Sequence, residues 1–164
     1  MSHSIAGARG RVEDPEGVLR RARDWASPIG TEVLLADARI VFGRDHLESA
    51  VLHAERARAT GRMTSRTLPN EVLRYLAAQR QVANALRVGG LRKGTEAVAV
   101  AILGPGSVDE LIAHLGWERD DAVLAPEGKS LRVLGISRTE ERTVTGSRKV
   151  DLALEKVALL DVLG

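Results

Sequence analysis

Arginine side chains gather in one stretch of this 164-residue chain, where their chemistry suits phosphate binding. Residues 56–93, the basic segment, hold nine basic side chains and one acid, Glu71, so nine minus one gives a net charge of +8. The whole chain carries +2, so the remaining residues carry +2 minus 8, or −6. Arginine presents a planar fork of donors that fits phosphate oxygens. We expect these guanidinium groups to form one exposed cradle for a polyanion, and a merely solvated face is the alternative.

A second pattern resembles the end of a nucleotide-binding phosphate loop. Gly128-Lys129-Ser130 has the required Gly-Lys-Ser order. The first glycine of such a loop would fall at position 123, where Val123 stands, and Asp120-Asp121 occupy the place of the preceding apolar strand. A turn ahead of a short helix explains these residues equally well. A small nucleotide-binding enzyme that uses Gly128, Lys129 and Ser130 is therefore the alternative function.

No other pattern in the sequence nominates a catalyst. His46 and His53 lie seven residues apart, which is too far for two metal ligands on neighbouring turns of a helix. The adjacent acids Glu140 and Glu141 point apart on a helix, so they do not imply shared acid–base work. The absence of cysteine excludes a disulfide, a thiolate metal site and a cysteine nucleophile. We expect no catalytic residue, no metal ion and no cofactor.

Composition places the chain among folded globular proteins. Hydrophobic residues make up 44% and charged residues 28%, and 164 residues fit a single domain over 1–164. The longest apolar run covers residues 97–103, far short of the roughly 20 residues that cross a bilayer. No apolar stretch follows the basic N-terminus as in a signal peptide. We therefore expect no membrane association and a cytoplasmic location.

The hydrophobic pattern alternates between short strands and amphipathic helices. Strands are expected at residues 4–12, 32–36 and 97–103, with a further strand end at 39–42. The apolar run 97–103 predicts a strand that is covered on both faces. Helices are expected from Pro15, from Asp45 to Thr60, in 69–88, after Ser107 and over 147–163. The polar trio at residues 79–81 leaves open whether 69–88 is one helix or two.

Side chains at the expected helix starts and on the helix faces add detail. Asp14 and Ser107 are suited to cap helices, and Asp45 with Glu48 resembles a capping pair. The inner face of the helix over 45–60 should carry five apolar residues, which are Leu47, Ala50, Val51, Ala54 and Ala57. The closing helix is apolar on more than one side, which indicates deep burial or a second contact surface.

Three stretches together resemble the kinase-associated small subunit of the KEOPS complex, also called the PRPK-binding protein family. They are Leu-Ala-Asp-Ala-Arg-Ile-Val-Phe-Gly-Arg-Asp-His-Leu at 35–47, Asn-Glu-Val-Leu-Arg-Tyr-Leu-Ala-Ala-Gln-Arg-Gln-Val at 70–82 and Leu-Glu-Lys-Val-Ala-Leu-Leu-Asp-Val at 154–162. The similarity extends from about residue 32 onward. The sequence departs from the family pattern at two places. The family usually has Tyr-Ala where Tyr75 is followed here by Leu76 and Ala77, and it has isoleucine where Val82 stands.

The resemblance implies an α+β fold, with one small, mostly antiparallel or mixed sheet of three to four strands packed with several helices. It implies a noncatalytic accessory subunit that binds the small atypical kinase of the KEOPS complex. It also implies recruitment of transfer RNA, through its single-stranded acceptor end, for threonylcarbamoyladenosine synthesis. An interaction module without a nucleic-acid role is a further alternative.

The resemblance also points to particular residues. The Arg80-Gln81 pair matches the family motif inside the basic segment and is the first candidate for nucleic-acid binding. The other candidates for nucleic-acid binding are Arg62, Arg66, Arg74 and Lys93.

The resemblance also implies a contact with the kinase. The candidates for this contact are Leu73, Leu76 and Leu160 of the closing helix, with an ordinary place in the core as the alternative for each. An arginine of the basic segment that pairs with Glu71 would likewise be structural. Tyr75 is the one aromatic ring in the segment, so stacking of several bases on rings is not expected.

Overall fold

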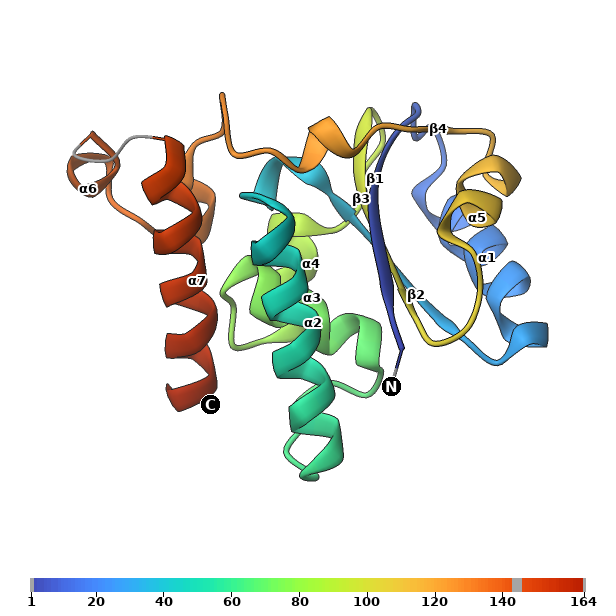
Figure 1. Cartoon of the computed structure of the whole chain (residues 1–164), viewed down its shortest axis with the longest axis horizontal. Coiled ribbons are helices and arrows are strands. Elements are labelled where there is room, and N and C mark those ends of the chain that lie inside the picture. Colours follow the sequence, from blue (N-terminus) through green and yellow to red (C-terminus); the bar gives the residue numbers. More distant parts are fainter. Residues whose placement is uncertain (1, 143–145, 164) are drawn as a thin grey trace.

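The chain folds into a four-stranded antiparallel sheet with helices on both faces (Figure 1). The computed structural model describes residues 2–142 and 146–163. The strands are β1 (Ser4–Arg9), β2 (Glu32–Asp37), β3 (Ala97–Leu103) and β4 (Glu118–Arg119), in the order β2-β3-β1-β4. The helices are α1 (Pro15–Ala26), α2 (Arg44–Ala59), α3 (Leu68–Ala77), α4 (Val82–Gly89), α5 (Val108–His114), α6 (Arg138–Arg142) and α7 (Gly146–Leu163). This architecture confirms the expected α+β class and its small sheet.

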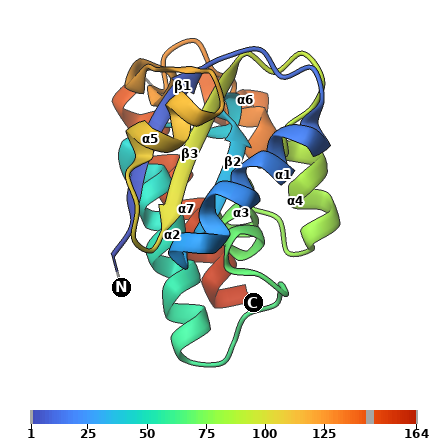
Figure 2. The same ribbon diagram turned by 90° about the vertical axis from the view of Figure 1, so that its right-hand side faces the viewer.

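Strand β3 is one of the two inner strands of the sheet and faces a core on each side. Val98, Val100 and Ile102 pack with residues of α1 and α5, whereas Ala99 and Ala101 pack with residues of α2 and α3. Figures 1 and 2 show α1 and α5 on one face of the sheet and α2, α3, α4 and α7 on the other. Because successive side chains of a strand point to opposite faces, the two-sided cover requires an unbroken apolar run. The prediction of a strand covered on both faces is confirmed.

Most helix starts agree with the sequence, but α2 begins in a different way. Asp14 accepts a hydrogen bond from the Gly17 N–H, and Ser107 caps α5. The residue before α2 is Gly43, at φ 107, and its N–H donates to the Leu124 carbonyl at 2.6 Å. A positive φ is easily adopted only by glycine, so the turn is made by the backbone. The expected cap at Asp45 is therefore wrong, while the five expected apolar residues of α2 are all buried.

The strand end expected at residues 39–42 is also wrong. Residues Ala38–Ile40 form a single 3-10 turn instead. The Asp37 carboxylate accepts a hydrogen bond from the Arg39 N–H at 3.1 Å and pairs with the Arg39 guanidinium at 3.1 Å. A side chain that bonds to the backbone two residues ahead offers an alternative to the strand ladder, and it ends β2 here.

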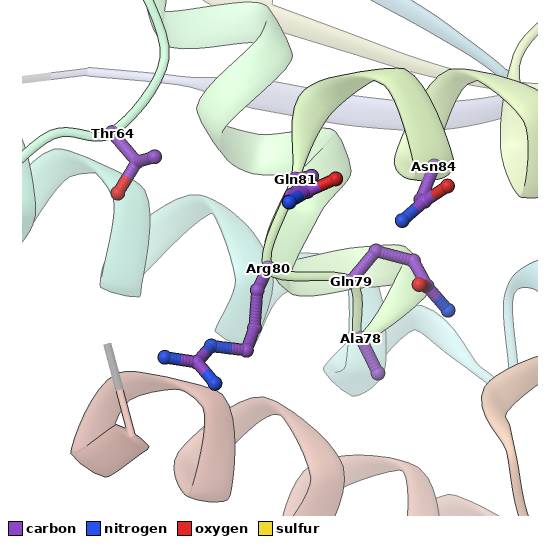
Figure 3. A pocket seen from close by; sticks show the side chains of 6 residues that line it. All are labelled: Thr64, Ala78, Gln79, Arg80, Gln81 and Asn84. Atoms are coloured by element: carbon purple, nitrogen blue, oxygen red, sulfur yellow. The ribbon is translucent and has the colours of Figure 1, made fainter.

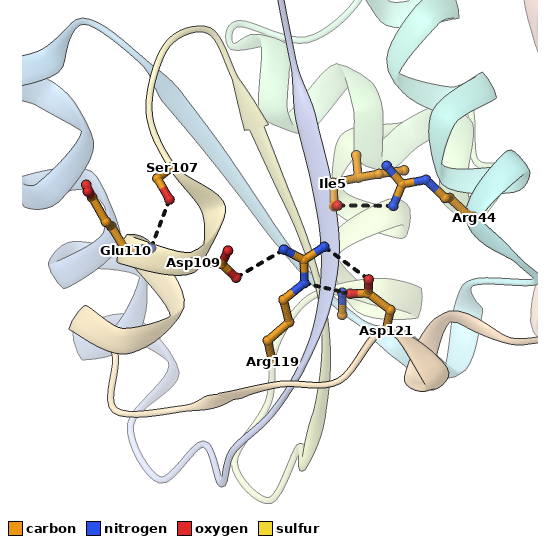
Figure 4. Close-up of polar contacts among 8 residues, drawn as sticks. Ile5, Arg44, Ser107, Asp109, Glu110, Arg119 and Asp121 are labelled. Carbon is orange, nitrogen blue, oxygen red and sulfur yellow. Dashed lines mark hydrogen bonds and ion pairs between the residues drawn. The ribbon is translucent and has the colours of Figure 1, made fainter.

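The short strand β4 is fixed by charged side chains (Figure 4). The Arg119 guanidinium donates to Asp109 of α5 and to Asp121, each at 3.0 Å. Asp121 also accepts from the Gly7 N–H at 3.0 Å, and Asp120 caps the 3-10 turn Asp121–Leu124. Asp120 and Asp121 therefore have structural roles.

Among the described residues, no helix combines the length and the apolar character that crossing a membrane requires.

Candidate nucleic-acid interface

An open hollow of about 730 Å³ lies at the connection between α3 and α4. Its lining residues are Thr64, Ala78, Gln79, Arg80, Gln81 and Asn84. Helix α3 ends because Ala78 adopts a left-handed conformation at φ 55, and α4 begins four residues later at Val82. This break confirms the alternative of two helices over 69–88. It also turns the polar trio at residues 79–81 toward the hollow.

Amide and guanidinium groups take different sides of the hollow. Figure 3 shows the side-chain amides of Gln79, Gln81 and Asn84 on one side, while Arg80 extends away from them toward α7. The exposed Arg80 guanidinium donates to the carbonyl of Leu163 at 3.5 Å, at the last turn of α7. An amide both donates and accepts hydrogen bonds, as the edge of a nucleobase does, whereas a guanidinium suits phosphate. The hollow thus combines the two kinds of group that bind a single-stranded nucleotide.

A buried ion pair holds the two loops that border the hollow. Arg74 Nη1 lies 3.0 Å from Glu71 Oε1, and both side chains are almost fully buried. Glu71 also accepts from the N–H groups of Ser65 at 3.0 Å and Thr64 at 3.3 Å, in the α2–α3 connection. Arg74 Nε donates to the backbone carbonyl of Arg80 at 2.7 Å. The pair therefore joins the Thr64 loop to the Arg80 loop.

This arrangement corrects the expectation that Arg74 contacts nucleic acid. Only 2% of Arg74 is exposed, and its guanidinium is occupied by Glu71 and by the Arg80 carbonyl. The alternative of a structural arginine paired with Glu71 describes it correctly. Arg74 acts on the candidate site only by positioning the backbone of Arg80.

Two further candidates, Arg62 and Arg66, are exposed on the connection between α2 and α3.

The Tyr75 hydroxyl donates a hydrogen bond to Asp161 of α7 at 2.8 Å, and burial together with this bond raises the pKa of Tyr75 to about 12. Burial alone would raise the pKa of Asp161, but hydrogen bonds from Tyr75 and His53 and the charge of Arg62 outweigh it, so this pKa is lowered. Arg62 therefore lies near the same end of α7 as Arg80, and buried Tyr75 offers no stacking surface.

Lys93 lies at the other end of the molecule, so the expectation of one cradle is wrong. The neighbouring Gly94 N–H donates to the Val12 carbonyl at 2.8 Å, just beyond the end of β1. In Figure 1 the loop before β3 is at the end of the sheet opposite to the C-terminus of α7, where Arg80 lies. The basic segment supplies arginines to the hollow, but it does not form a single surface.

The family model of the kinase binding protein CGI-121 matches residues 20–121, which is more than half of the chain and includes the whole hollow. The chain belongs to the CGI-121 family. This membership confirms the resemblance seen in the sequence and supports a kinase-binding accessory role. No curated protein sequence matches the chain.

The three leucines that were expected to contact the kinase are core residues of this CGI-121 family member. Leu73 is 1%, Leu76 0% and Leu160 6% exposed. They pack between the sheet and helices α2, α3 and α7, so their burial corrects the expectation of a partner contact. The exposed apolar side chains near the end of α7 are Leu159 at 49%, Val162 at 82% and Leu163 at 58%. The broad apolar character of the closing helix thus reflects both a buried face and an exposed one.

The Gly-Lys-Ser run does not form a phosphate loop. Lys129 Nζ donates to the carbonyls of Val41 at 2.7 Å and Val123 at 2.6 Å, and burial lowers the pKa of Lys129 to about 8. The Lys129 N–H closes a turn on the Pro126 carbonyl, and Ser130 caps the 3-10 turn Leu131–Leu134. A lysine committed to two backbone carbonyls is not placed to bind phosphate. This geometry favours the turn over the nucleotide-binding enzyme.

The sequence signalled only part of the hollow. The trio at residues 79–81 is visible in the sequence because it interrupts an apolar stripe, and its Arg80-Gln81 pair matches the family motif. Thr64 carries no such local signal, since folding brings it to the hollow from the α2–α3 connection, and Asn84 follows the trio within α4 without standing out in the sequence. A non-glycine residue in the left-handed region, Ala78, is a feature that only the structure shows.

Proposed function

We propose that this chain is a noncatalytic accessory subunit of the KEOPS complex. It binds the small atypical kinase of the complex and the single-stranded acceptor end of transfer RNA, and so recruits that RNA for threonylcarbamoyladenosine synthesis. The observation that supports the RNA part is the hollow at the α3–α4 connection, where three side-chain amides line one side and the exposed Arg80 extends along the other. The match to the CGI-121 family supports the kinase part.

The chemistry of the hollow favours a flexible single strand over a duplex. Proteins that recognise RNA sequence mostly bind unpaired bases, whose edges are open to side-chain amides. Gln79, Gln81 and Asn84 provide such amides within one hollow, and Arg80 can bind a phosphate or stack its planar group on a base. The 3′ end of transfer RNA is unpaired and flexible, so it can enter a hollow of this size.

Replacing Arg80 by alanine is expected to weaken transfer-RNA binding by about tenfold near 0.1 M salt, because one charge-assisted contact is lost. The slope of log affinity against log salt should become shallower by about one unit. Fluorescence anisotropy with labelled transfer RNA at several salt concentrations measures both quantities. The matched control is Arg20→Ala, an exposed arginine of α1 on the opposite face of the sheet.

Two results would count against this function. One is equal affinity and equal salt slope for Arg80→Ala and Arg20→Ala. The other is equal binding of intact transfer RNA and of transfer RNA that lacks its unpaired 3′ nucleotides, since the hollow is proposed to hold that end.

The kinase contact is proposed for the exposed apolar end of α7. Leu159→Asp should abolish co-purification with the small kinase, because a charge replaces a side chain that the complex would bury. Leu52→Asp is the matched control, since Leu52 of α2 is 47% and Leu159 49% exposed. Thermal unfolding of each variant checks that the fold is retained. Unchanged co-purification of Leu159→Asp would remove α7 from the interface.

A further inference from the structure

A second hollow, of about 460 Å³, lies where α6 and the start of α7 meet the 3-10 turn Leu131–Leu134. It is lined by Ser130, Arg132, Arg138, Glu141, Arg142 and Lys149. Four of these side chains are basic and one is acidic, so four minus one gives the lining a net charge of +3. All of them lie beyond residue 121, outside the match to the CGI-121 family. We propose that this hollow binds a ligand through its phosphate groups, whether they belong to an ester or to an anhydride, and the proposal is independent of the function proposed above.

The arginines of the second hollow carry charge that their surroundings leave uncompensated. Within residues 2–142 and 146–163, the side chains of Arg132, Arg138 and Arg142 have no ion pair and no hydrogen bond. The acid Glu141 accepts a hydrogen bond from the Ser130 hydroxyl at 3.1 Å and forms no ion pair with them. Like charges brought into one hollow repel each other, and a bound anion removes that repulsion.

Three separate elements bring these cations together. Arg138 and Arg142 are four residues apart on α6, so they lie on the same side of that helix. Arg132 comes from the 3-10 turn, and Lys149 comes from the first turns of α7. Lys149 Nζ donates to the Lys129 carbonyl at 2.7 Å, which fixes its amino group beside the hollow. Several guanidinium forks around one space fit the oxygens of phosphate better than a single carboxylate.

The second hollow is distinct from the hollow at Arg80. Lys149 lies near the beginning of α7, and Arg80 contacts Leu163 at its end. These two positions are 14 residues apart, or roughly 21 Å along the helix axis at about 1.5 Å per residue. One small anion is therefore too short to contact both hollows at the same time. Figure 1 shows α6 and the C-terminus at opposite ends of α7.

Isothermal titration of the full chain with pyrophosphate, ATP and transfer RNA tests the proposal. We expect the double variant Arg138→Ala and Arg142→Ala to weaken phosphate binding at least tenfold, while Arg20→Ala leaves it unchanged. Both arginines are exposed and unpaired in the described structure, so the double variant should fold, and its thermal midpoint checks this. Arg80→Ala serves as a separate control, because its loss of RNA binding reports on the first hollow alone.

The ligands distinguish the source of the phosphate. Weaker binding of pyrophosphate or ATP by the double variant would identify a small phosphate ligand. Weaker binding of transfer RNA, with a shallower salt slope and no saturable ATP binding, would identify the RNA backbone. The proposal is overturned if the double variant binds all three ligands as the unchanged chain does, or if none of them binds.

Discussion

Replacing Glu71 by glutamine is expected to lower the free energy of unfolding by about 3–5 kcal/mol, because it breaks a buried ion pair. Glu71 is 0% and Arg74 2% exposed, so the change leaves a guanidinium charge inside the protein without its carboxylate. Glutamine keeps the volume and one acceptor oxygen, which limits the loss to charge and geometry. Urea unfolding at pH 7 measures the difference.

An exposed ion pair provides the matched control for this experiment. Glu32 of β2 pairs with Arg58 of α2 at 3.1 Å, with 41% and 35% of the two side chains exposed. Because solvent screens such a pair, Glu32→Gln should change the free energy of unfolding by at most about 1 kcal/mol. Equal effects of Glu71→Gln and Glu32→Gln would show that burial does not strengthen the dependence of Arg74 on its partner.

The same buried pair connects stability to the candidate site. Glu71 holds the loop of Thr64, and Arg74 holds the backbone of Arg80, so both borders of the hollow depend on it. A double replacement, Glu71→Leu with Arg74→Met, removes both charges and should recover part of the stability lost in Glu71→Gln. The loops would still lose their anchors, so transfer-RNA binding should remain weak. A stable double variant with weak RNA binding would separate positioning from folding.

The sheet and the helices were predictable because burial imposes a repeating pattern on the sequence. The run at 97–103 and the five apolar residues of α2 follow directly from which faces are covered. The start of α2 was missed because Gly43 makes its turn with the backbone, whereas Asp45 and Glu48 only resemble a cap. The end of β2 was missed because one side chain, Asp37, competes with the ladder.

The candidate site was less predictable, because it depends on which side chains are buried and how the chain folds back. Nine basic residues in one stretch suggested one surface, but Lys93 and Arg80 lie at opposite ends of the molecule. The lone acid of the stretch, three residues before Arg74, was the signal for a buried pair. The second hollow gave no signal, because its four basic residues are spread over positions 132–149 and three elements.

Acid is expected to destabilise the chain through His46, by about 2 kcal/mol between pH 7 and pH 5. His46 is 0% exposed, its Nδ1 accepts a hydrogen bond from the Phe42 N–H at 3.0 Å, and burial lowers its pKa to about 3. In the unfolded chain a histidine has a pKa of about 6.5. Below about pH 6.5, His46 binds a proton in the unfolded state but stays neutral in the folded state. The free energy of unfolding therefore falls as the pH drops toward 3.

A variant that cannot titrate isolates this contribution from every other histidine. His46→Asn retains an oxygen that can accept the hydrogen bond from Phe42, although the loss of the ring lowers stability at all pH values. Urea unfolding of both proteins at pH 7 and pH 5 gives two pH-dependent losses. The loss for the unchanged chain should exceed that for His46→Asn by about 2 kcal/mol, because only the former has to protonate His46 on unfolding. Two equal losses would mean that His46 accepts its proton in the folded state, and that water or a counter-charge reaches the imidazolium and stabilises it there.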